Sequence, residues 1–347
     1  MCCYIPDEVS KMNQKHLKFI CTELQLGSPE EAVTNVLGCR GGSFMWRVNT
    51  DKGTYAIKQL APEIDLKSEK IVAKYELSET IAYRFAQQGI NAIYAIKKSG
   101  KHLNIIENIG YLVYPWVEGY TLAKKEISET HALKIAEIIA KLHNINLIVP
   151  EADAPRFDIY TNDSIIQAID KAVAFKCPFA KNLKENQTLI LNVNDTYQSA
   201  IPLLSEHTVI SHGDLDRLNV MWNKAGQPIL IDWESARRLN PTREIVRASL
   251  SWSYDATEGV SMPIYTHMLQ TYIKSGGILN INLVDAALNA VYGGMVYWML
   301  YNIKIACSSN IPEKIDAAVE EVNSSVQSME RLKLLIPDLL KVSVYKS

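Results

Sequence analysis

The chain has 347 residues, of which 48% are hydrophobic, and its mean hydropathy is −0.05. This length and composition predict a globular protein that buries a sizeable core and has room for two domains of ordinary size. Lys and Arg number 36 against 38 Asp and Glu, which gives a formal charge of −2. Because there is no basic excess, the composition does not favour nucleic acid as a partner.

Six cysteines are present, and apart from Cys2 and Cys3 they are widely scattered. The sequence has no CxxC pair, no Cys/His cluster and no signal-peptide pattern, so we expect a reduced, cytoplasmic setting. The uncharged run 286–303 just reaches the length of a membrane span. It contains Asn289 and Asn302, and we therefore expect a buried helix and no membrane partner.

The N-terminal part of the chain predicts one helix followed by strands. Residues 7–25 carry apolar side chains at near-helical spacing, which favours a helix. Three strand-like runs follow, at 32–38, 43–50 and 54–60. A turn with Gly41 and Gly42 separates the first two runs, and Lys58 lies near the end of the third.

A helix and further strands complete this region. Residues 67–88 carry an apolar stripe with helical spacing and include Glu79. Strand-like runs are expected at 91–96 and 102–107. The apolar run 111–119 then breaks at Pro115, as a connection between two lobes would.

The remainder of the chain is predicted to be mainly helical, apart from one strand-rich stretch at 209–236. Helices are expected at 131–147, 164–175, 186–204, 243–252, 263–275 and 283–307, and from 312 onward with 332–340 closing the chain.

The stretch 209–236 contains the pattern of a β-hairpin, because apolar runs at 219–222 and 229–231 flank a loop with Gly and Pro. Symmetric pairing about a six-residue loop would set Asn219 opposite Asp232. Directly opposed residues have Cβ atoms about 4.5 to 5.5 Å apart. An amide oxygen and a carboxylate at that distance can reach one hard cation, such as Mg²⁺.

A third polar residue precedes this hairpin. Asp214 lies five residues before Asn219, on the loop that follows the short apolar strand at 209–210. A carboxylate there can accept the proton of a hydroxyl that attacks a phosphoryl group. Phosphoryl transfer depends mainly on positioning and charge neutralisation, so a base and two metal ligands form a nearly sufficient set.

The pattern HxDxxxxN, read as His212, Asp214 and Asn219 and followed thirteen residues later by Asp232, resembles the aminoglycoside phosphotransferase and choline kinase group. The resemblance implies an α+β, bilobal, protein-kinase-like fold. A small antiparallel-sheet lobe with one key helix would span residues 1–115. A larger, mainly helical lobe would span residues 116–347.

The resemblance also implies the activity and the residues of the catalytic loop. The expected reaction transfers the γ-phosphate of ATP, with Mg²⁺, to a hydroxyl of a small, amine-bearing acceptor. Asp214 would be the catalytic residue, and His212 would support its loop. Asn219 and Asp232 would hold the metal.

Further residues are implied at the nucleotide site. Lys58 would bind the ATP phosphates, and Glu79 is the helix carboxylate whose spacing best matches a partner for it. The turn with Gly41 and Gly42 would cover the phosphates through its backbone amides. Tyr114 and Trp116 would lie beside the adenine, which backbone groups would hold.

Two kinds of acceptor site stay open. Asp255 and Glu258 would suit a polycationic aminoglycoside, whereas six aromatic residues could form a box for choline through cation–π contacts. These aromatic residues are Trp252, Tyr254, Tyr292, Tyr297, Trp298 and Tyr301. Aromatic residues at helical spacing more often belong to a core. A metabolic kinase for choline, ethanolamine or homoserine is therefore an alternative to an aminoglycoside kinase.

Two alternatives from other classes are weaker. A nucleotide-binding pseudokinase scaffold would have no physical need for the base, both metal ligands and the lysine together. A protein kinase is disfavoured because no DFG or APE motif follows the catalytic loop and HGD stands where protein kinases have HRD. The sequence leaves the oligomeric state open.

Overall fold

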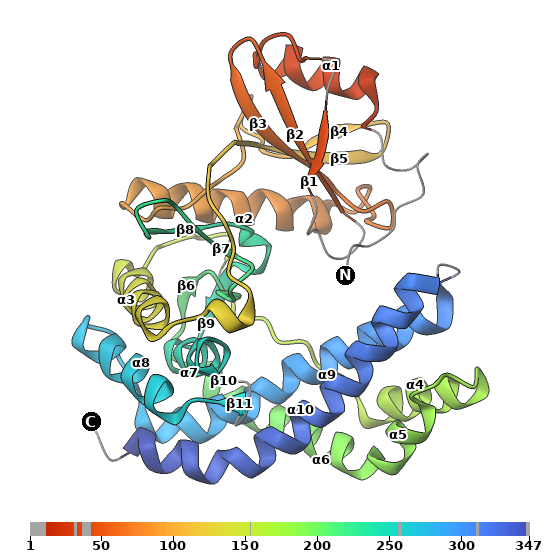
Figure 1. Cartoon of the computed structure of the whole chain (residues 1–347), viewed down its shortest axis with the longest axis vertical. Coiled ribbons are helices and arrows are strands. Elements are labelled where there is room, and N and C mark those ends of the chain that lie inside the picture. Colours follow the sequence, from red (N-terminus) through yellow and green to blue (C-terminus); the bar gives the residue numbers. More distant parts are fainter. Residues whose placement is uncertain are drawn as a thin grey trace. The chain divides into compact units, whose positions relative to one another are not determined.

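The computed structural model describes residues 12–30, 33–36, 43–152, 154–255, 259–309 and 312–344 (Figure 1). The chain divides into two compact units. The N-terminal unit comprises Met1–Leu122, Leu147–Ala152 and His212–Ala236. The C-terminal unit comprises Ala123–Asn146, Asp153–Ser211 and Arg237–Ser347. The division expected at residue 115 differs from this one, because the segment 212–236 groups with the N-terminal unit and not with the helical part of the chain.

The N-terminal unit is built on a five-stranded antiparallel sheet with the strand order β1-β2-β3-β5-β4. Its strands are β1 (Thr34–Val36), β2 (Phe44–Thr50), β3 (Gly53–Gln59), β4 (Asn104–Ile106) and β5 (Ile109–Pro115). The strand expected at 91–96 is not part of this sheet. Single backbone bonds hold that segment instead, among them Ile93 N–H to the Leu230 carbonyl at 2.9 Å and Ile96 N–H to the Val113 carbonyl at 2.7 Å.

The two faces of the sheet have separate cores, because successive side chains of a strand point to opposite faces. On one face Tyr111 and Val113 of β5 belong to a buried cluster with α1 (Gln14–Glu23), to which Leu17 contributes. Leu112, between them, belongs to a second cluster with Tyr75 of α2 (Glu69–Gln87). Alternate side chains of β5 therefore belong to the two different cores.

The hairpin of the N-terminal unit forms as predicted, but with a different register. Its strands are β7 (Val220–Trp222) and β8 (Pro228–Leu230), and the short helix η2 (Trp233–Ser235) follows. The carbonyl of Asn219 accepts from the N–H of Ile231 at 3.0 Å, so Asn219 does not stand opposite Asp232. The loop is one residue shorter than expected because Asn223 and Gln227 close it, with an N–H to carbonyl bond of 3.0 Å.

The C-terminal unit contains the elements η1 (Lys124–Glu126), α3 (Glu129–Ile145), α4 (Asn162–Ala174), α5 (Ala180–Glu185), α6 (Gln187–Leu204), β6 (Val209–Ser211), β9 (Arg237–Leu239), α7 (Pro241–Trp252), β10 (Tyr254–Asp255), β11 (Gly259–Val260), α8 (Met262–Lys274), η3 (Ile281–Leu283), α9 (Val284–Ser308) and α10 (Pro312–Val344). The helices expected here all form, and their ends differ from the expected ones by at most two residues, except that α10 continues to Val344, beyond the expected end at 340. α5 was not anticipated, and α10 continues through Pro337 as one helix.

The apolar run predicted to be a buried helix lies in α9. The stretch Ile281–Ser308 is long and apolar enough to cross a membrane, and half of its apolar window is buried inside the protein. α9 packs against α6, α7 and α10 within the C-terminal unit. Its apolar composition is that of a central helix with neighbours on several sides.

Candidate active site

Lys58 lies on β3 directly opposite Leu112 of β5, so its side chain is on the sheet face that packs against α2. Its Nζ is 2.6 Å from Glu234 Oε1 and 3.2 Å from Asp232 Oδ1, and its side chain is only 12% exposed. Burial acts to lower the pKa of Lys58, but the charges of Asp232 and Glu234 outweigh it and hold the pKa above its ordinary value. Lys58 is therefore a fixed cation beside two carboxylates.

Glu79 of α2, the expected partner of Lys58, binds other groups. Its Oε2 accepts from the Ala95 N–H at 2.6 Å, and its Oε1 accepts from the Tyr114 hydroxyl at 2.8 Å. Burial raises the pKa of Glu79 to about 7, although these hydrogen bonds and the charge of Lys58 act in the opposite direction. Lys58 and Glu79 therefore do not form the expected ion pair. Lys58 binds Asp232 and Glu234 instead. Glu79 accepts from the Ala95 N–H and the Tyr114 hydroxyl.

The loop predicted to be catalytic is anchored through His212 to the strand end that precedes Asp232. His212 is fully buried, and its Nε2 donates to the Ile231 carbonyl at 3.0 Å. Its ring lies 4.5 Å from that of Trp233, which in turn stacks at 5.5 Å on Phe85 of α2. Gly213 has a φ of +76°, a conformation that an Arg at this place would rarely adopt, which explains the HGD sequence. The geometry fits the supporting role predicted for His212.

Asn219 is hydrogen bonded to Asp214, the residue that the sequence predicts to be catalytic. Its Nδ2 donates to the Asp214 carbonyl at 2.8 Å and to Asp214 Oδ2 at 3.1 Å. The Asn219 amide oxygen takes part in none of the hydrogen bonds found among the described residues. Asn219 thus orients Asp214 and keeps an oxygen for a further ligand.

Asp232 offers the second oxygen expected at a metal site. It has a φ of +60°, a left-handed conformation that Asp tolerates better than most residues, and its side chain is 44% exposed. Asp232 and Glu234 place two carboxylates beside the single charge of Lys58, so the excess of negative charge suits a further cation. Over the described parts of the chain no group of three His, Cys, Asp or Glu side chains forms a metal cluster. Mg²⁺ needs fewer, since it usually takes one or two carboxylates together with water and substrate phosphates.

The segment after β5 was expected to contact adenine. The N–H of Trp116 binds the Thr54 carbonyl at 3.1 Å, which prolongs the β3–β5 pairing by one residue. The guanidinium of Arg47 lies 4.6 Å above the Trp116 ring, and the Trp116 Nε1 donates to Glu118 at 2.7 Å. Tyr114 is likewise engaged, through Glu79. Both rings have protein partners, and their contact with adenine stays a prediction.

The same segment then runs beside the hairpin. Tyr120 and Trp222 exchange two backbone hydrogen bonds, at 2.8 and 3.1 Å. A Cβ at Gly119 would lie 3.0 Å from the Trp222 carbonyl oxygen, so this close approach favours glycine. Gly41 and Gly42, expected over the phosphates, lie outside the described residues.

The aromatic residues predicted to form an acceptor box do not form one. Trp252 is fully buried and belongs to the core. Tyr254 has the Lys124 ammonium 5.1 Å from its ring, so a cation of the chain already lies over that face. For Asp255 the structure describes only the backbone, which pairs with Gly259.

On α9 the remaining candidates stack on each other. Trp298 and Tyr301 have ring centroids 5.4 Å apart at an interplanar angle of 21°, and Tyr297 stacks on Tyr301 at 6.3 Å. The Trp298 Nε1 donates to Glu321 at 2.8 Å. Tyr297 is 42% exposed. A choline box needs several ring faces turned toward one cavity, whereas these rings turn their faces toward one another.

Sequence reasoning missed Glu234 and the internal network around His143. Glu234 follows Asp232 by two residues. The second carboxylate of the sequence IDWE could have indicated it as a partner for Lys58. His143 on α3 is hydrogen bonded at both nitrogens, to Tyr272 Oη and to Glu244 Oε2, each at 2.7 Å. These bonds tie α3, α7 and α8 together, so His143 has a structural role in the C-terminal unit.

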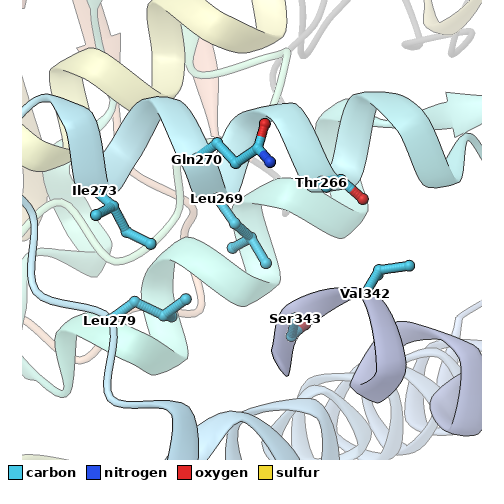
Figure 2. A pocket seen from close by; sticks show the side chains of 7 residues that line it. All are labelled: Thr266, Leu269, Gln270, Ile273, Leu279, Val342 and Ser343. Atoms are coloured by element: carbon cyan, nitrogen blue, oxygen red, sulfur yellow. The ribbon is translucent and has the colours of Figure 1, made fainter. Parts of the chain in front are cut away.

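A small depression elsewhere in the C-terminal unit contains none of the predicted site residues. Figure 2 shows its lining, which comes from α8, the loop after it and the end of α10. The lining residues are Thr266, Leu269, Gln270, Ile273, Leu279, Val342 and Ser343.

A five-stranded sheet that carries a lysine, one helix across it and a hairpin bearing acidic residues define a protein-kinase-like phosphotransferase. The profile of the phosphotransferase enzyme family matches residues 40–269, well over half of the chain. The chain belongs to this family. It is an enzyme that transfers phosphoryl groups to hydroxyl groups of small molecules, and the resemblance drawn from the sequence is confirmed.

Solved structures confirm the predicted fold. Spectinomycin phosphotransferase APH(9)-Ia, in complex with ADP and spectinomycin, is 11% identical with a TM-score of 0.67, covering 93% of this chain and 99% of that chain. Ethanolamine kinase from Plasmodium vivax is 15% identical with a TM-score of 0.57, covering 91% of each chain. Choline kinase LicA from Streptococcus pneumoniae is 15% identical with a TM-score of 0.56, covering 90% and 99%. No curated protein sequence matches the chain.

Proposed function

We propose that this protein is an ATP- and Mg²⁺-dependent kinase of a small molecule. The observation that carries the proposal is the Lys58 ammonium held at 2.6 and 3.2 Å from two carboxylates, in the unit whose catalytic loop has Asn219 bonded to Asp214. This set supplies a cation for phosphates, oxygens for a metal and a carboxylate for the acceptor hydroxyl.

Each residue has a defined task in the transfer. The acceptor hydroxyl oxygen attacks the γ-phosphorus, the bond to the bridging oxygen breaks, and ADP leaves. Asp214 orients the hydroxyl and accepts its proton, while Asn219 holds the Asp214 carboxylate in place. Lys58 balances charge on the phosphates. Asn219 and Asp232 would hold Mg²⁺, which supplies further neutralisation of the phosphate oxygens when bound.

Relatives support the use of a nucleotide. Spectinomycin phosphotransferase has been solved with ADP and with AMP, and a related phosphotransferase, APH(2'')-IIIa, with GDP and kanamycin. The β3 lysine and the segment after β5 correspond to the parts that cover phosphates and hold adenine in this fold. Lys58, Tyr114 and Trp116 are therefore our candidates for contacts to ATP.

The test compares two loop carboxylates. Acceptor-dependent ADP release is measured for aminoglycosides, choline, ethanolamine and homoserine, and Mg·ATP binding is measured by calorimetry. Asp214→Asn should lose roughly 10²- to 10⁴-fold in kcat while it binds Mg·ATP normally. Asp216→Asn is the matched control, because Asn can still accept from the Leu218 N–H as Asp216 does at 2.7 Å. Equal transfer rates in wild type and Asp214→Asn would overturn the proposal.

A further inference from the structure

The sheet face that carries Lys58 is more open on one side of that lysine than on the other. Side chains of a strand alternate between the two faces, so Ala56 and Thr54 lie on the same face as Lys58. Both are half-buried. Leu60, just after the end of β3, is 1% exposed and packs in the buried cluster that includes Tyr75 of α2. A molecule bound at Lys58 therefore has room to extend over Ala56 and Thr54, and not over Leu60.

A nucleotide whose phosphates lie at Lys58 would place its base over this part of the face. An antiparallel strand rises about 3.4 Å per residue, so Ala56 is roughly 7 Å and Thr54 roughly 14 Å from Lys58 along β3. In a nucleotide one ribose separates the base from the phosphates, a separation that falls within this range. The base would therefore lie between the levels of Ala56 and Thr54.

The strands on either side of β3 bring an arginine and a tryptophan to the same level. Arg47 of β2 is directly opposite Ala56 in the ladder, so the two side chains are on one face of the sheet. Trp116 directly follows β5, and its N–H donates to the Thr54 carbonyl at 3.1 Å. The part of the face where a base would lie is therefore bordered by Arg47 and Trp116.

Arg47, Trp116 and Glu118 form a cluster in which each member contacts the other two. The Arg47 guanidinium lies 4.6 Å above the centre of the Trp116 ring. Its Nη2 is 3.7 Å from Glu118 Oε1, the same oxygen that accepts from Trp116 Nε1 at 2.7 Å. The side chain of Arg47 is nevertheless 42% exposed. The cluster thus orients the guanidinium and leaves part of it open to a ligand.

We propose that Arg47 binds the nucleobase, with its guanidinium stacked on the flat purine ring while Trp116 and Glu118 hold the guanidinium in position. The inference rests on the proposed kinase function and adds a residue that contacts the base. Guanidinium groups stack on aromatic faces, and nucleobases stack on arginine in the same way. Stacking depends on the ring face and not on its edge groups, so Arg47 should contribute equally to the binding of adenine and guanine nucleotides.

Calorimetry with the whole protein tests this contact. Arg47→Ala should weaken the binding of Mg·ADP and of Mg·GDP by about 5-fold or more, within the range of a cation–π contact. Arg47→Lys keeps the charge and loses the flat group, so it should weaken both as well. Binding of Mg·pyrophosphate, which has no base, should not change in either variant. Arg84→Ala is the matched control, because Arg84 lies on α2 in the same unit and its Nη1 donates to the Ile148 carbonyl at 2.8 Å.

Kinetics separate a base contact from a structural role. KM for ATP should rise in Arg47→Ala by a similar factor, while kcat and the melting temperature stay near wild type, since the base lies away from the bonds that change. Unchanged Mg·ADP binding in Arg47→Ala, wild-type binding in Arg47→Lys, or an equal loss of Mg·pyrophosphate binding would overturn the proposal. Transfer that still depends on Lys58 and Asp214 in such a case would leave the kinase function standing.

Discussion

The Lys58 ammonium lies 2.6 Å from Glu234 Oε1. Glu234 follows Asp232 by two residues. Glu79, which accepts from the Ala95 N–H, is not the partner of Lys58. Lys58→Met keeps the apolar stem and removes the charge, so kcat/KM for ATP should fall by about 10²-fold or more while the N-terminal unit stays folded. Lys52→Met is the control, since Lys52 is exposed and its Nζ contacts only a carbonyl. Steady-state kinetics and thermal melting check both. Unchanged activity per folded molecule in Lys58→Met would contradict the phosphate role.

Asp232→Asn tests the metal site with little change of shape, because Asn also tolerates the left-handed backbone found at Asp232. Loss of the charge should raise the Mg²⁺ concentration needed for half-maximal activity and lower kcat by roughly 10²-fold or more. Asn219→Ala should lower kcat as well as the Mg²⁺ response, because Asn219 also holds Asp214. Titration of activity with Mg²⁺ separates the two effects. Near wild-type activity of Asp232→Asn at saturating Mg²⁺ would exclude Asp232 as a ligand.

Glu79 should make stability depend on pH. Its pKa is raised by burial to about 7, above its value in the unfolded chain, so the folded state binds the proton more tightly. The stability that this carboxyl contributes is complete below about pH 4 and is lost as the pH rises through 7. In the wild type, this loss should lower the unfolding free energy by roughly 3 kcal/mol between about pH 4 and 8. In Glu79→Gln that decrease should be absent. Urea unfolding at several pH values measures this, and parallel curves for the two proteins would contradict it.

The His143–Glu244 pair should matter for stability and not for chemistry. Both side chains are buried, and Glu244→Ala leaves a His143 nitrogen without its 2.7 Å partner. We expect a loss of about 3 kcal/mol or more in unfolding free energy, the usual scale for breaking a buried pair. KM and kcat per folded molecule should stay near wild type at a temperature well below the melting point. A selective loss of kcat without destabilisation would assign the pair a catalytic role.

The thiols of Cys177 and Cys307 lie 3.5 Å apart in the C-terminal unit, although 130 residues separate them. A two-electron oxidant such as diamide should join them, and the reaction should be faster at high pH because burial raises the pKa of Cys307 to about 11. Intact mass and peptide mapping show the loss of two hydrogens and the linked peptides. Cys177→Ser is the control. An oxidised protein in which these two thiols remain free would contradict the prediction.

Local sequence determined the helices, the hairpin and the family of this protein. Apart from α5 and the end of α10, apolar spacing placed the helices of the C-terminal unit within two residues, because helix periodicity depends on neighbours three and four positions away. The motif of His212, Asp214, Asn219 and Asp232 lies within one short segment, so the spacing of these residues in the chain is enough to indicate the reaction. A local pattern of this kind is readable without a structure.

The hairpin register and the partner of Lys58 were decided only by tertiary structure. A shift of one residue followed from side-chain bonds of Asn223 inside the loop, which apolar spacing does not encode. Of the glutamates on α2, the spacing in the sequence favoured Glu79 as the partner of Lys58. In the structure Glu234 is the nearest carboxylate to Lys58, because the turn after Asp232 brings Glu234 to the sheet.

The acceptor site shows the same limit. Trp252 and Trp298 look alike in the sequence, yet one is buried in the core and the other stacks on Tyr301 and binds Glu321. Sequence alone therefore supported the reaction class. The surroundings of these two side chains were decided by tertiary structure, because the contacts that bury or expose them join residues that are far apart in the chain.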